Sequence, residues 1–398
     1  MATDLEQLFH RIRALEIDTP QGHSGRLTRE SRFVFNYRDH AEESAAVSLV
    51  MPVRSQSYTG GELPGVFAMN RPEGYLRYII EERLKRLGAP DDMLLLWLSG
   101  GNGIGRLDYR LPGEDRPAEA GERLDTLLRS PSPALFADLI DRFALRSGIS
   151  GVQPKTVVPL RPDPPQEHAA LPLPTVIVKA EGSDYPGLAR NEFLCLSVAR
   201  EAGLEVPEAW LSDDGLMLVV ARFDRTPEGR ALGFEDMAVL TGRSAARKYE
   251  GSYEMVAKAV SIYTAEAAAR ELPRLFARVA LSCKLRDGDA HLKNFGLLYE
   301  HPAGPRRLAP VYDVVCTDIY PELDGKPALK LNQRKRFPDD RELMEFGQRL
   351  GLVKDEAQTL LNRLDTAIDA VLARLAGDDR FTGDGLLGRI RAAIYRES

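Results

Sequence analysis

Apolar residues recur along the first part of the chain with two different periods. Segments 32–37 and 46–51 have the β-branched and aromatic content of strands, and the apolar run 93–98 is also expected to be a strand. Helical spacing of apolar residues predicts helices over 4–15 and 73–87. The pattern therefore predicts a small, strand-rich unit at the amino terminus.

The rest of the chain alternates strands with helices and then becomes mainly helical. Apolar, β-branched runs predict strands at 156–158, 175–178 and 216–220. Apolar residues at 3.6-residue spacing predict helices over 131–146, from 191 onward, over 252–285 and over 352–375. Ser130 or Ser132 is available to cap the first of these helices.

Two boundaries follow from this order. A stretch rich in Pro, Gly, Glu and Arg at 112–123 is typical of a linker. The chain leaves the strand 216–220 at the point where a two-lobed protein would have its hinge. We therefore divide the chain into 1–125, 126–222 and 223–398.

Composition narrows the class of protein. The 398 residues are 28% charged and 43% hydrophobic, as in soluble globular proteins. A net charge of -6 argues against a globally basic nucleic-acid binder. Apolar runs stay below the ~18 residues that span a bilayer, and the first residues are acidic where a secretory signal is basic. Three widely spaced cysteines fit neither a disulfide framework nor a zinc site, so we expect a cytoplasmic protein.

Residues 287–294 carry the side chains best suited to phosphoryl transfer. Asp289 and Asn294 are five positions apart, as the catalytic Asp and a metal-binding Asn are in protein kinases, and Asp313 follows. Phosphoryl transfer needs a carboxylate at the attacking hydroxyl and oxygen ligands for Mg²⁺. Asp, Gly and Asn are also common in surface turns, so the motif alone is weak. The apolar run 295–299 favours the catalytic interpretation, because it places the loop beside a buried strand.

The glycines at 101, 103 and 105 form a stretch that is similar to a nucleotide-binding loop. A dinucleotide fingerprint needs a strand before it and a helix after it, whereas the alternating segment 106–111 follows here. Asn-Gly between two strands is typical of a hairpin, so we predict a β-hairpin in preference to phosphate binding.

Small residues at 147–155 lie between a predicted helix and a predicted strand. Glycines there would let backbone N–H groups surround phosphate oxygens, although an ordinary loop would have the same residues. Lys179 ends the strand 175–178, where kinases place a phosphate-contacting lysine, and Glu192 starts the next helix as a candidate partner. A lysine that extends to solvent and a carboxylate favoured by the helix dipole are the alternative explanations.

In combination, these segments resemble the HipA-type toxin kinases of bacterial toxin–antitoxin systems. The resemblance depends on the order of separated motifs, at 150–155, 176–179, 191–193, 222–225, 288–295 and 309–313. Segments 48–52 and 69–74 are similar to the small amino-terminal subdomain of that family. Each motif is weak alone, and their ordered combination is specific.

The resemblance implies an α+β fold of the two-lobed, protein-kinase-like (HipA-like) type, with a small β-rich amino-terminal subdomain and a mainly helical carboxy-terminal lobe. It implies ATP and Mg²⁺ as cofactors, Asp289 as catalytic base, Asn294 and Asp313 as metal ligands, and Glu192 as the partner of Lys179. The implied nucleotide-binding residues are Ser150, Gly151, Val152, Gln153, Pro154, Lys155, Lys179, Ala221, Arg222, Phe223, His291, Leu292, Lys293, Asn294, Tyr312 and Asp313.

The resemblance also implies partners. Toxins of this type phosphorylate a translation component, typically an aminoacyl-tRNA synthetase, and are held in check by a DNA-binding antitoxin. We therefore expect a serine/threonine protein kinase that contacts DNA only through the antitoxin, does not bind membranes and phosphorylates its own phosphate loop. Gly148 stands where one form of the family has its modified serine. We predict Ser150 as the modified residue here, with Ser147 second.

Two other functions are compatible with the same residues. Aminoglycoside, choline and lipid kinases use a similar Asp-x-His-x-x-Asn loop, so a small-molecule kinase differs only in the acceptor. A catalytically silent module that docks to an antitoxin is the non-enzymatic alternative. The retained Asp289, Asn294 and Asp313 argue against lost chemistry.

Overall fold

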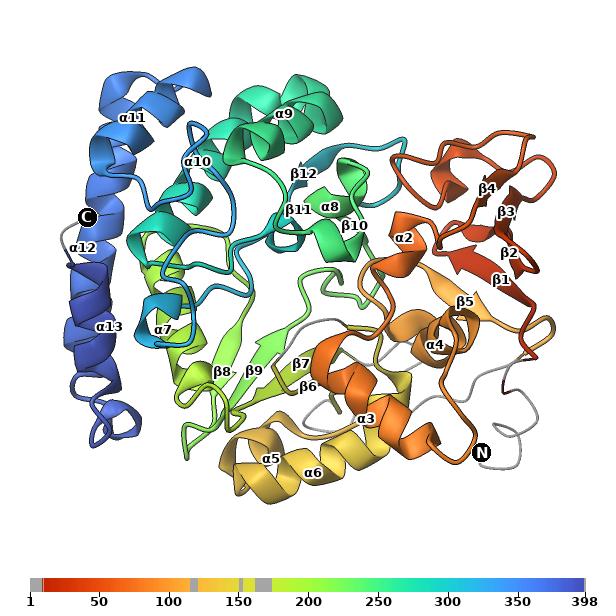
Figure 1. Ribbon diagram of the computed structural model, residues 1–398, viewed down its shortest axis with the longest axis horizontal. Coiled ribbons are helices and arrows are strands. Elements are labelled where there is room, and N and C mark those ends of the chain that lie inside the picture. The colour runs from red at the N-terminus through yellow and green to blue at the C-terminus, as the bar shows by residue number, and fades with distance from the viewer. Residues whose placement is uncertain (1–8, 10, 115–120, 150–152, 162–173, 397–398) are drawn as a thin grey trace.

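The computed structural model describes residues 9, 11–114, 121–149, 153–161 and 174–396 (Figure 1). Its strands are β1 (Ala14–Thr19), β2 (Gly22–Arg29), β3 (Phe33–Tyr37), β4 (Tyr58–Gly60), β5 (Asp108–Arg110), β6 (Lys155–Pro159), β7 (Thr175–Ala180), β8 (Ala209–Leu211), β9 (Met217–Ala221), β10 (Gly233–Asp236), β11 (Gly296–Tyr299) and β12 (Arg306–Leu308). Its α-helices are α2 (Gly65–Ala68), α3 (Gly74–Leu84), α4 (Asp92–Ser99), α5 (Leu124–Arg129), α6 (Ser132–Phe143), α7 (Leu188–Glu201), α8 (Met237–Leu240), α9 (Tyr253–Thr264), α10 (Ala268–Lys284), α11 (Asp340–Arg349), α12 (Lys354–Leu375) and α13 (Leu386–Ile394).

The strands form three antiparallel sheets, which lie in three regions of the molecule. The amino-terminal sheet has the order β4-β3-β2-β1-β5, the middle sheet β6-β7-β9-β8, and the small third sheet β10-β11-β12. In Figure 1 the amino-terminal sheet lies at one end of the molecule and helices α11, α12 and α13 at the other, with the middle sheet between them. This is the expected α+β arrangement of a β-rich amino-terminal subdomain and a helical carboxy-terminal lobe.

The middle sheet positions the lysines that the sequence singled out. Helix α6 packs against β6 and β7, and α7 packs against β8 and β9. In the antiparallel register of β6 and β7, Lys155 lies directly opposite Lys179. Side chains of directly opposed residues lie on the same face of a sheet. The two ammonium groups are therefore brought to the same face.

Several sequence predictions for the first subdomain are wrong. Residues 93–98 belong to helix α4, because Asp91 caps its start by accepting the Leu94 N–H at 2.9 Å and the Leu-rich run contains no β-branched residue. Residues 46–51 contain only an isolated bridge between Ser48 and Met51. The helix expected over 4–15 gives way to strand β1 from residue 14, while residues 1–8 and 10 lie outside the described residues.

The caps of helix α6 also differ from the prediction. The residue before the helix is Pro131, which makes no side-chain capping bond. Asp214, from the loop between β8 and β9, accepts the Ser132 N–H at 2.9 Å and the Ser132 hydroxyl at 2.6 Å instead. A carboxylate from a distant part of the chain thus replaces the expected serine cap.

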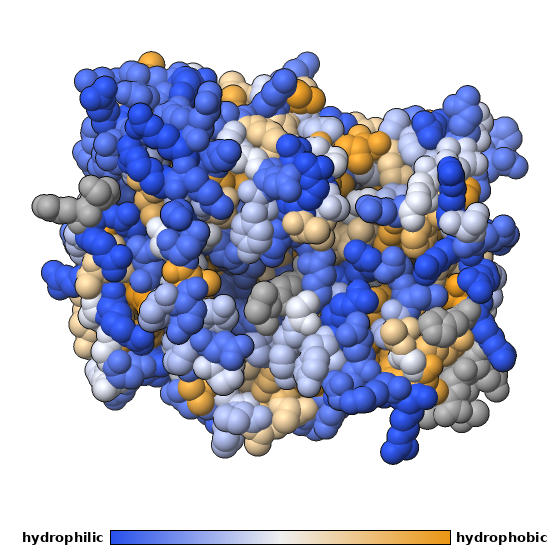
Figure 2. All heavy atoms as spheres, viewed as in Figure 1, coloured by the Kyte–Doolittle hydropathy of each residue, from blue (hydrophilic) through white to orange (hydrophobic). Residues whose placement is uncertain are grey.

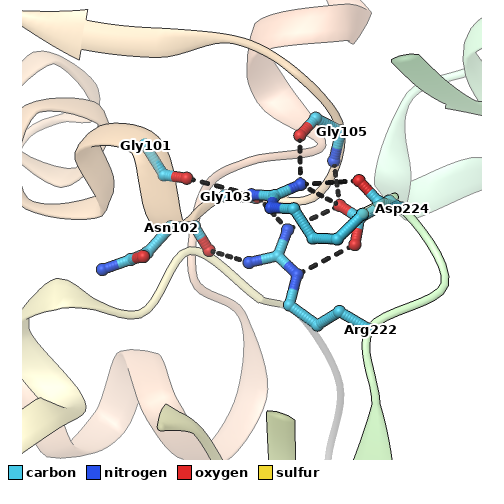
Figure 3. A network of polar contacts seen from close by, with 7 residues as sticks. Gly101, Asn102, Gly103, Gly105, Arg222 and Asp224 are labelled. Carbon is cyan, nitrogen blue, oxygen red and sulfur yellow. Dashed lines mark hydrogen bonds and ion pairs between the residues drawn. The ribbon is translucent and has the colours of Figure 1, made fainter. Parts of the chain in front are cut away.

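The glycine-rich stretch at 101–105 is neither a hairpin nor a phosphate loop. It receives the hinge residues of the middle sheet, as Figure 3 shows for Arg222 and Asp224. Arg222 donates to the Gly103 carbonyl at 2.6 Å, and the Gly105 N–H donates to Asp224 Oδ2 at 2.6 Å. Arg222 and Asp224 also form a fully buried ion pair at 2.5 Å. The glycines therefore supply backbone groups that fasten the amino-terminal subdomain to the hinge.

On the face shown in Figure 2 most residues are hydrophilic and the apolar ones are scattered. Within the described residues, no helix combines the length and the hydropathy that crossing a bilayer requires.

Candidate active site

A cleft of about 520 Å³ lies between the middle sheet and the carboxy-terminal lobe. Most of the predicted site residues line it, although they come from separate parts of the chain. These are Gln153, Lys155, Lys179, Glu192, Ala221, Phe223, Asp289, His291, Lys293, Tyr312 and Asp313. Ile177 and Val220 add apolar side chains from strands β7 and β9. The cleft therefore combines apolar side chains from strands β7 and β9 with charged side chains.

Lys179 joins the two lobes through a pair of carboxylates. Its Nζ lies 2.5 Å from Glu192 Oε1, in helix α7, and 2.7 Å from Asp313 Oδ1. Although burial opposes the charged form, the charges of Asp313 and Glu192 raise the pKa of Lys179 above its ordinary value. Burial likewise works against ionised Asp313, but Lys179 and Lys155 hold the pKa of that carboxyl well below its ordinary value. The predicted Lys179–Glu192 pair is thus present in the structure.

Lys155 presents a second buried ammonium group to the cleft. Its side chain makes no hydrogen bond or ion pair with the parts of the chain that the structure describes. Burial lowers the pKa of Lys155, and the neighbouring charge of Asp313 opposes that shift. A buried cation without a bonded partner is costly. An anion in the cleft would compensate it.

Asp289 lies at the open side of the cleft, in the loop between α10 and β11. Its backbone N–H donates to Asp287 Oδ1 at 3.0 Å, and its Oδ1 accepts the Tyr249 hydroxyl at 2.6 Å. Burial raises the pKa of Asp289, while the hydrogen bond from Tyr249 and the charge of Lys248 oppose this shift. Burial also lowers the pKa of the nearby His291 to about 3, so its imidazole is neutral. Asp289 is therefore a candidate proton acceptor at the open side of the cleft.

The predicted metal ligands Asn294 and Asp313 contact each other, although only Asp313 lines the cleft. The Asn294 Nδ2 donates to the Asp313 carbonyl at 3.1 Å. The Asn294 Oδ1 is buried and has no partner in the described part of the chain, while the Asp313 side chain is 40% exposed. Mg²⁺ typically takes one or two protein oxygens and completes its shell with phosphate and water. An orphaned amide oxygen beside an accessible carboxylate fits this ion.

Aromatic rings close the hinge side of the cleft. Phe223 stacks on Tyr312 with ring centroids 4.8 Å apart, and the Tyr312 hydroxyl donates to the Lys293 carbonyl at 2.8 Å. Ala221 and Phe223 line the cleft, as predicted for the adenine side. Arg222 does not line it, because its side chain is directed into the glycine-rich stretch (Figure 3). Leu292 lies in the apolar core of the carboxy-terminal lobe, so its side chain is not a cleft residue.

The predicted phosphate loop is described only in part. Ser150, Gly151 and Val152 lie outside the described residues, and Pro154 does not line the cleft. Ser147 is buried, and its Oγ donates to the Phe143 carbonyl at 3.0 Å and accepts the Val157 N–H at 3.0 Å. In this conformation the hydroxyl links the end of α6 to β6. Its phosphorylation would require these elements to separate.

Comparisons with known proteins agree with this geometry. The family model described as the HipA-like C-terminal domain matches residues 147–372, and that of the HipA N-terminal domain matches residues 15–110. The chain belongs to the HipA family. The first match contains the whole cleft apart from residues of the amino-terminal subdomain, which the second match contains.

Individual relatives extend the HipA assignment. A Sinorhizobium fredii protein named "Putative kinase Y4dM" is 30% identical over 296 residues, 69% of this chain and 67% of that protein. Another from the same organism, "Putative kinase Y4mE", is 26% identical over 83% of this chain and 84% of its own length. The Shewanella oneidensis HipA structure, from a complex with HipB and operator DNA, has a TM-score of 0.72 at 20% identity and covers 96% of this chain and 95% of its own. The HipA-like kinase fold is therefore shown.

Several residues of this HipA-type cleft were not found from the sequence. Glu73, from the amino-terminal subdomain, lines the cleft and forms an ion pair at 2.9 Å with the predicted residue Lys293. Tyr249, Lys248 and Asp236 also line the cleft. None of them belongs to a motif with a fixed spacing to Asp289. The one signal that the sequence offers for them is a charged or aromatic side chain near a predicted loop.

Arg278, in helix α10, holds together the loop between α10 and β11, here called the catalytic loop after its predicted role, and the segment that carries Asp313. Its buried guanidinium donates to the carbonyls of Asn294, Pro310 and Tyr312. It also lies between the rings of Phe295 and Tyr312, at 5.0 and 4.7 Å. The two segments that carry Asn294 and Asp313 thus share one anchor.

We expect Arg278→Met to lower the free energy of unfolding by about 3 kcal/mol, because buried carbonyls lose their donor. Urea unfolding measures this loss. Arg278→Lys should recover only part of it, since an ammonium cannot reproduce the planar fork. A fully stable Arg278→Met protein with wild-type turnover would show that this anchor is dispensable.

Proposed function

We propose that this HipA-family protein is an ATP- and Mg²⁺-dependent serine/threonine protein kinase. The observation that supports it most is the bridge from Lys179 to Glu192 and Asp313, in the same cleft as Asp289. A kinase requires a lysine held by a helix carboxylate and a second carboxylate for the metal. A silent binding module has no need for a cation and an acid held in this way.

Each residue has a defined task in this proposal. Lys155 and Lys179 would bind phosphate oxygens, which compensates the two buried ammonium groups. Asn294 and Asp313 would hold Mg²⁺, which neutralises polyphosphate charge when it is bound. Asp289 would accept the proton of the acceptor hydroxyl. Phe223 and the apolar side chains of Ile177 and Val220 would enclose the adenine.

We further propose that the protein is the toxin of a cytoplasmic toxin–antitoxin pair. The Shewanella HipA that shares its fold was solved with HipB and operator DNA. By the same resemblance, a DNA-binding antitoxin would hold this chain in check and provide the contact with DNA. The protein substrate would be a translation component such as an aminoacyl-tRNA synthetase. Autophosphorylation would fall on Ser150, because the hydroxyl of Ser147 is buried.

The proposal is tested by incubating the pure protein with γ-labelled ATP, Mg²⁺ and a bacterial extract. We expect one or a few labelled protein bands, and no label when EDTA removes Mg²⁺. Mass spectrometry of the labelled bands would identify the phosphorylated serine or threonine. Transfer of label only to aminoglycosides or other small alcohols would overturn the protein-kinase proposal.

A further inference from the structure

Tyr249 lies beside the catalytic loop but belongs to a different segment of the carboxy-terminal lobe. It precedes helix α9 and follows a short 3-10 helix at Ala245–Arg247. The Leu292 N–H donates to the carbonyl of the adjacent Lys248 at 3.1 Å. The ring of Tyr249 packs edge-on against His291, with centroids 5.1 Å apart and planes at 76°. The catalytic loop itself thus fixes the direction of this phenol.

The Tyr249 hydroxyl makes the contact that an acceptor hydroxyl would need. It donates to Asp289 Oδ1 at 2.6 Å. A general base must lie within about 2.6–3.2 Å of the oxygen whose proton it removes. The Asp289 side chain is 51% exposed and Tyr249 is 44% exposed, so the contact is formed at the open side of the cleft. An incoming hydroxyl would therefore compete with the phenol for the same carboxylate.

We propose that Tyr249 selects the acceptor: its phenol holds the acceptor position at Asp289 and keeps water out until a protein hydroxyl displaces it. This inference rests on the proposed kinase function. A water molecule gains little on binding that could offset the lost phenol–carboxylate hydrogen bond. A protein acceptor makes further contacts along the cleft, and that binding energy can offset the displacement.

Besides Asp289, the cleft has other side chains that a protein acceptor could contact. Tyr185 and Tyr320 pack edge to face, with ring centroids 5.2 Å apart, and both line the cleft. Leu323 and Pro327 also line the cleft. These groups come from segments other than strands β7 and β9. They offer an apolar surface for a protein segment, which neither water nor a small alcohol can use.

The test measures ADP release by the pure full-length protein with MgATP and no acceptor protein. We expect Tyr249→Phe to raise this basal hydrolysis roughly tenfold. Water would then no longer have to displace the hydrogen bond from the Tyr249 phenol to the charged Asp289 carboxylate. Tyr249→Ala should give at least the same increase. Asp289→Asn/Tyr249→Phe should show no increase, since the base is missing.

A pH profile separates this role from a structural one. Groups near Asp289 are Lys248, in the segment of Tyr249, together with Lys155, Asp287, His291 and Asp313. The phenol stabilises ionised Asp289, so its removal raises the pKa of that carboxyl. The acidic limb of ADP release should therefore move to higher pH in Tyr249→Phe. A merely structural tyrosine would lower the rate without moving this limb.

Tyr395→Phe is the matched control, because the Tyr395 phenol also donates to a carboxylate, that of Asp369, outside the cleft. Its basal hydrolysis should equal that of the wild type.

Basal hydrolysis that is unchanged or lower in Tyr249→Phe would overturn the inference. So would phosphate on Tyr249 after incubation with MgATP, which would make this residue an acceptor itself. Absence of nucleotide turnover in the wild type and in every variant would instead defeat the proposed function, and the inference with it.

Discussion

Asp289→Asn is expected to lower the rate of phosphoryl transfer by about 10²–10⁴-fold, the usual contribution of a general base. The amide keeps the size of the carboxylate and can still accept the Tyr249 hydroxyl through its oxygen, so the loop should keep its shape. Binding of MgATP should change little, because the proposed function places Asp289 at the acceptor hydroxyl and not at the nucleotide. Label transfer and calorimetric nucleotide binding, measured on the same preparation, separate the two effects.

Asp369→Asn is the matched control for this variant. Asp369, in helix α12, also accepts a tyrosine hydroxyl, but it does not line the cleft. Its transfer rate should equal that of the wild type. If Asp289→Asn retained full transfer activity, Asp289 could not be the base, and the assignment of the whole loop would need revision.

Lys179→Met should cost about 3–5 kcal/mol of the free energy of unfolding, because it leaves the buried Glu192 without its cation. It should also abolish phosphoryl transfer, since the proposed function assigns phosphate binding to Lys179. The double variant Lys179→Met/Glu192→Gln should regain most of the stability and none of the activity. Urea unfolding and label transfer measure these outcomes.

Lys284 provides an unusually close comparison for Lys179. It too bridges two carboxylates, Asp340 and Asp365, at 2.9 and 2.8 Å, but these are more than half exposed. Solvent-exposed pairs contribute about 0–1 kcal/mol, so Lys284→Met should be nearly as stable as the wild type. Equal losses in Lys179→Met and Lys284→Met would mean that burial of the Lys179 bridge has no energetic consequence.

The sequence predicted those parts of the site that depend on short-range order. Asp289 and Asn294 share one loop, and Lys179 follows directly from a β-branched strand, so local pattern was sufficient to find them. Helix α4 was predicted as a strand because the apolar run 93–98, six residues long, suits either structure. The Asp91 side chain, which caps the first turn, favours the helix over the strand.

Contacts across long sequence separations could not be predicted in this way. Tyr249 reaches Asp289 across 40 residues, and Glu73 reaches Lys293 across 220. The glycine-rich stretch was misjudged for the same reason, since its partners Arg222 and Asp224 lie about 120 residues later. Only the docking of the amino-terminal subdomain on the hinge shows why glycines stand there.

Calorimetric titration with a non-hydrolysable ATP analogue tests most directly whether Asn294, Asp313 and Lys179 form a magnesium-nucleotide site. We expect one binding event per chain in the presence of Mg²⁺. The dissociation constant should rise roughly tenfold or more when Mg²⁺ is omitted, and by a similar factor in Asp313→Asn. Each change corresponds to a loss of at least ~1.4 kcal/mol of binding free energy. Equal affinity of the wild type and Asp313→Asn, with no dependence on Mg²⁺, would contradict the proposed site.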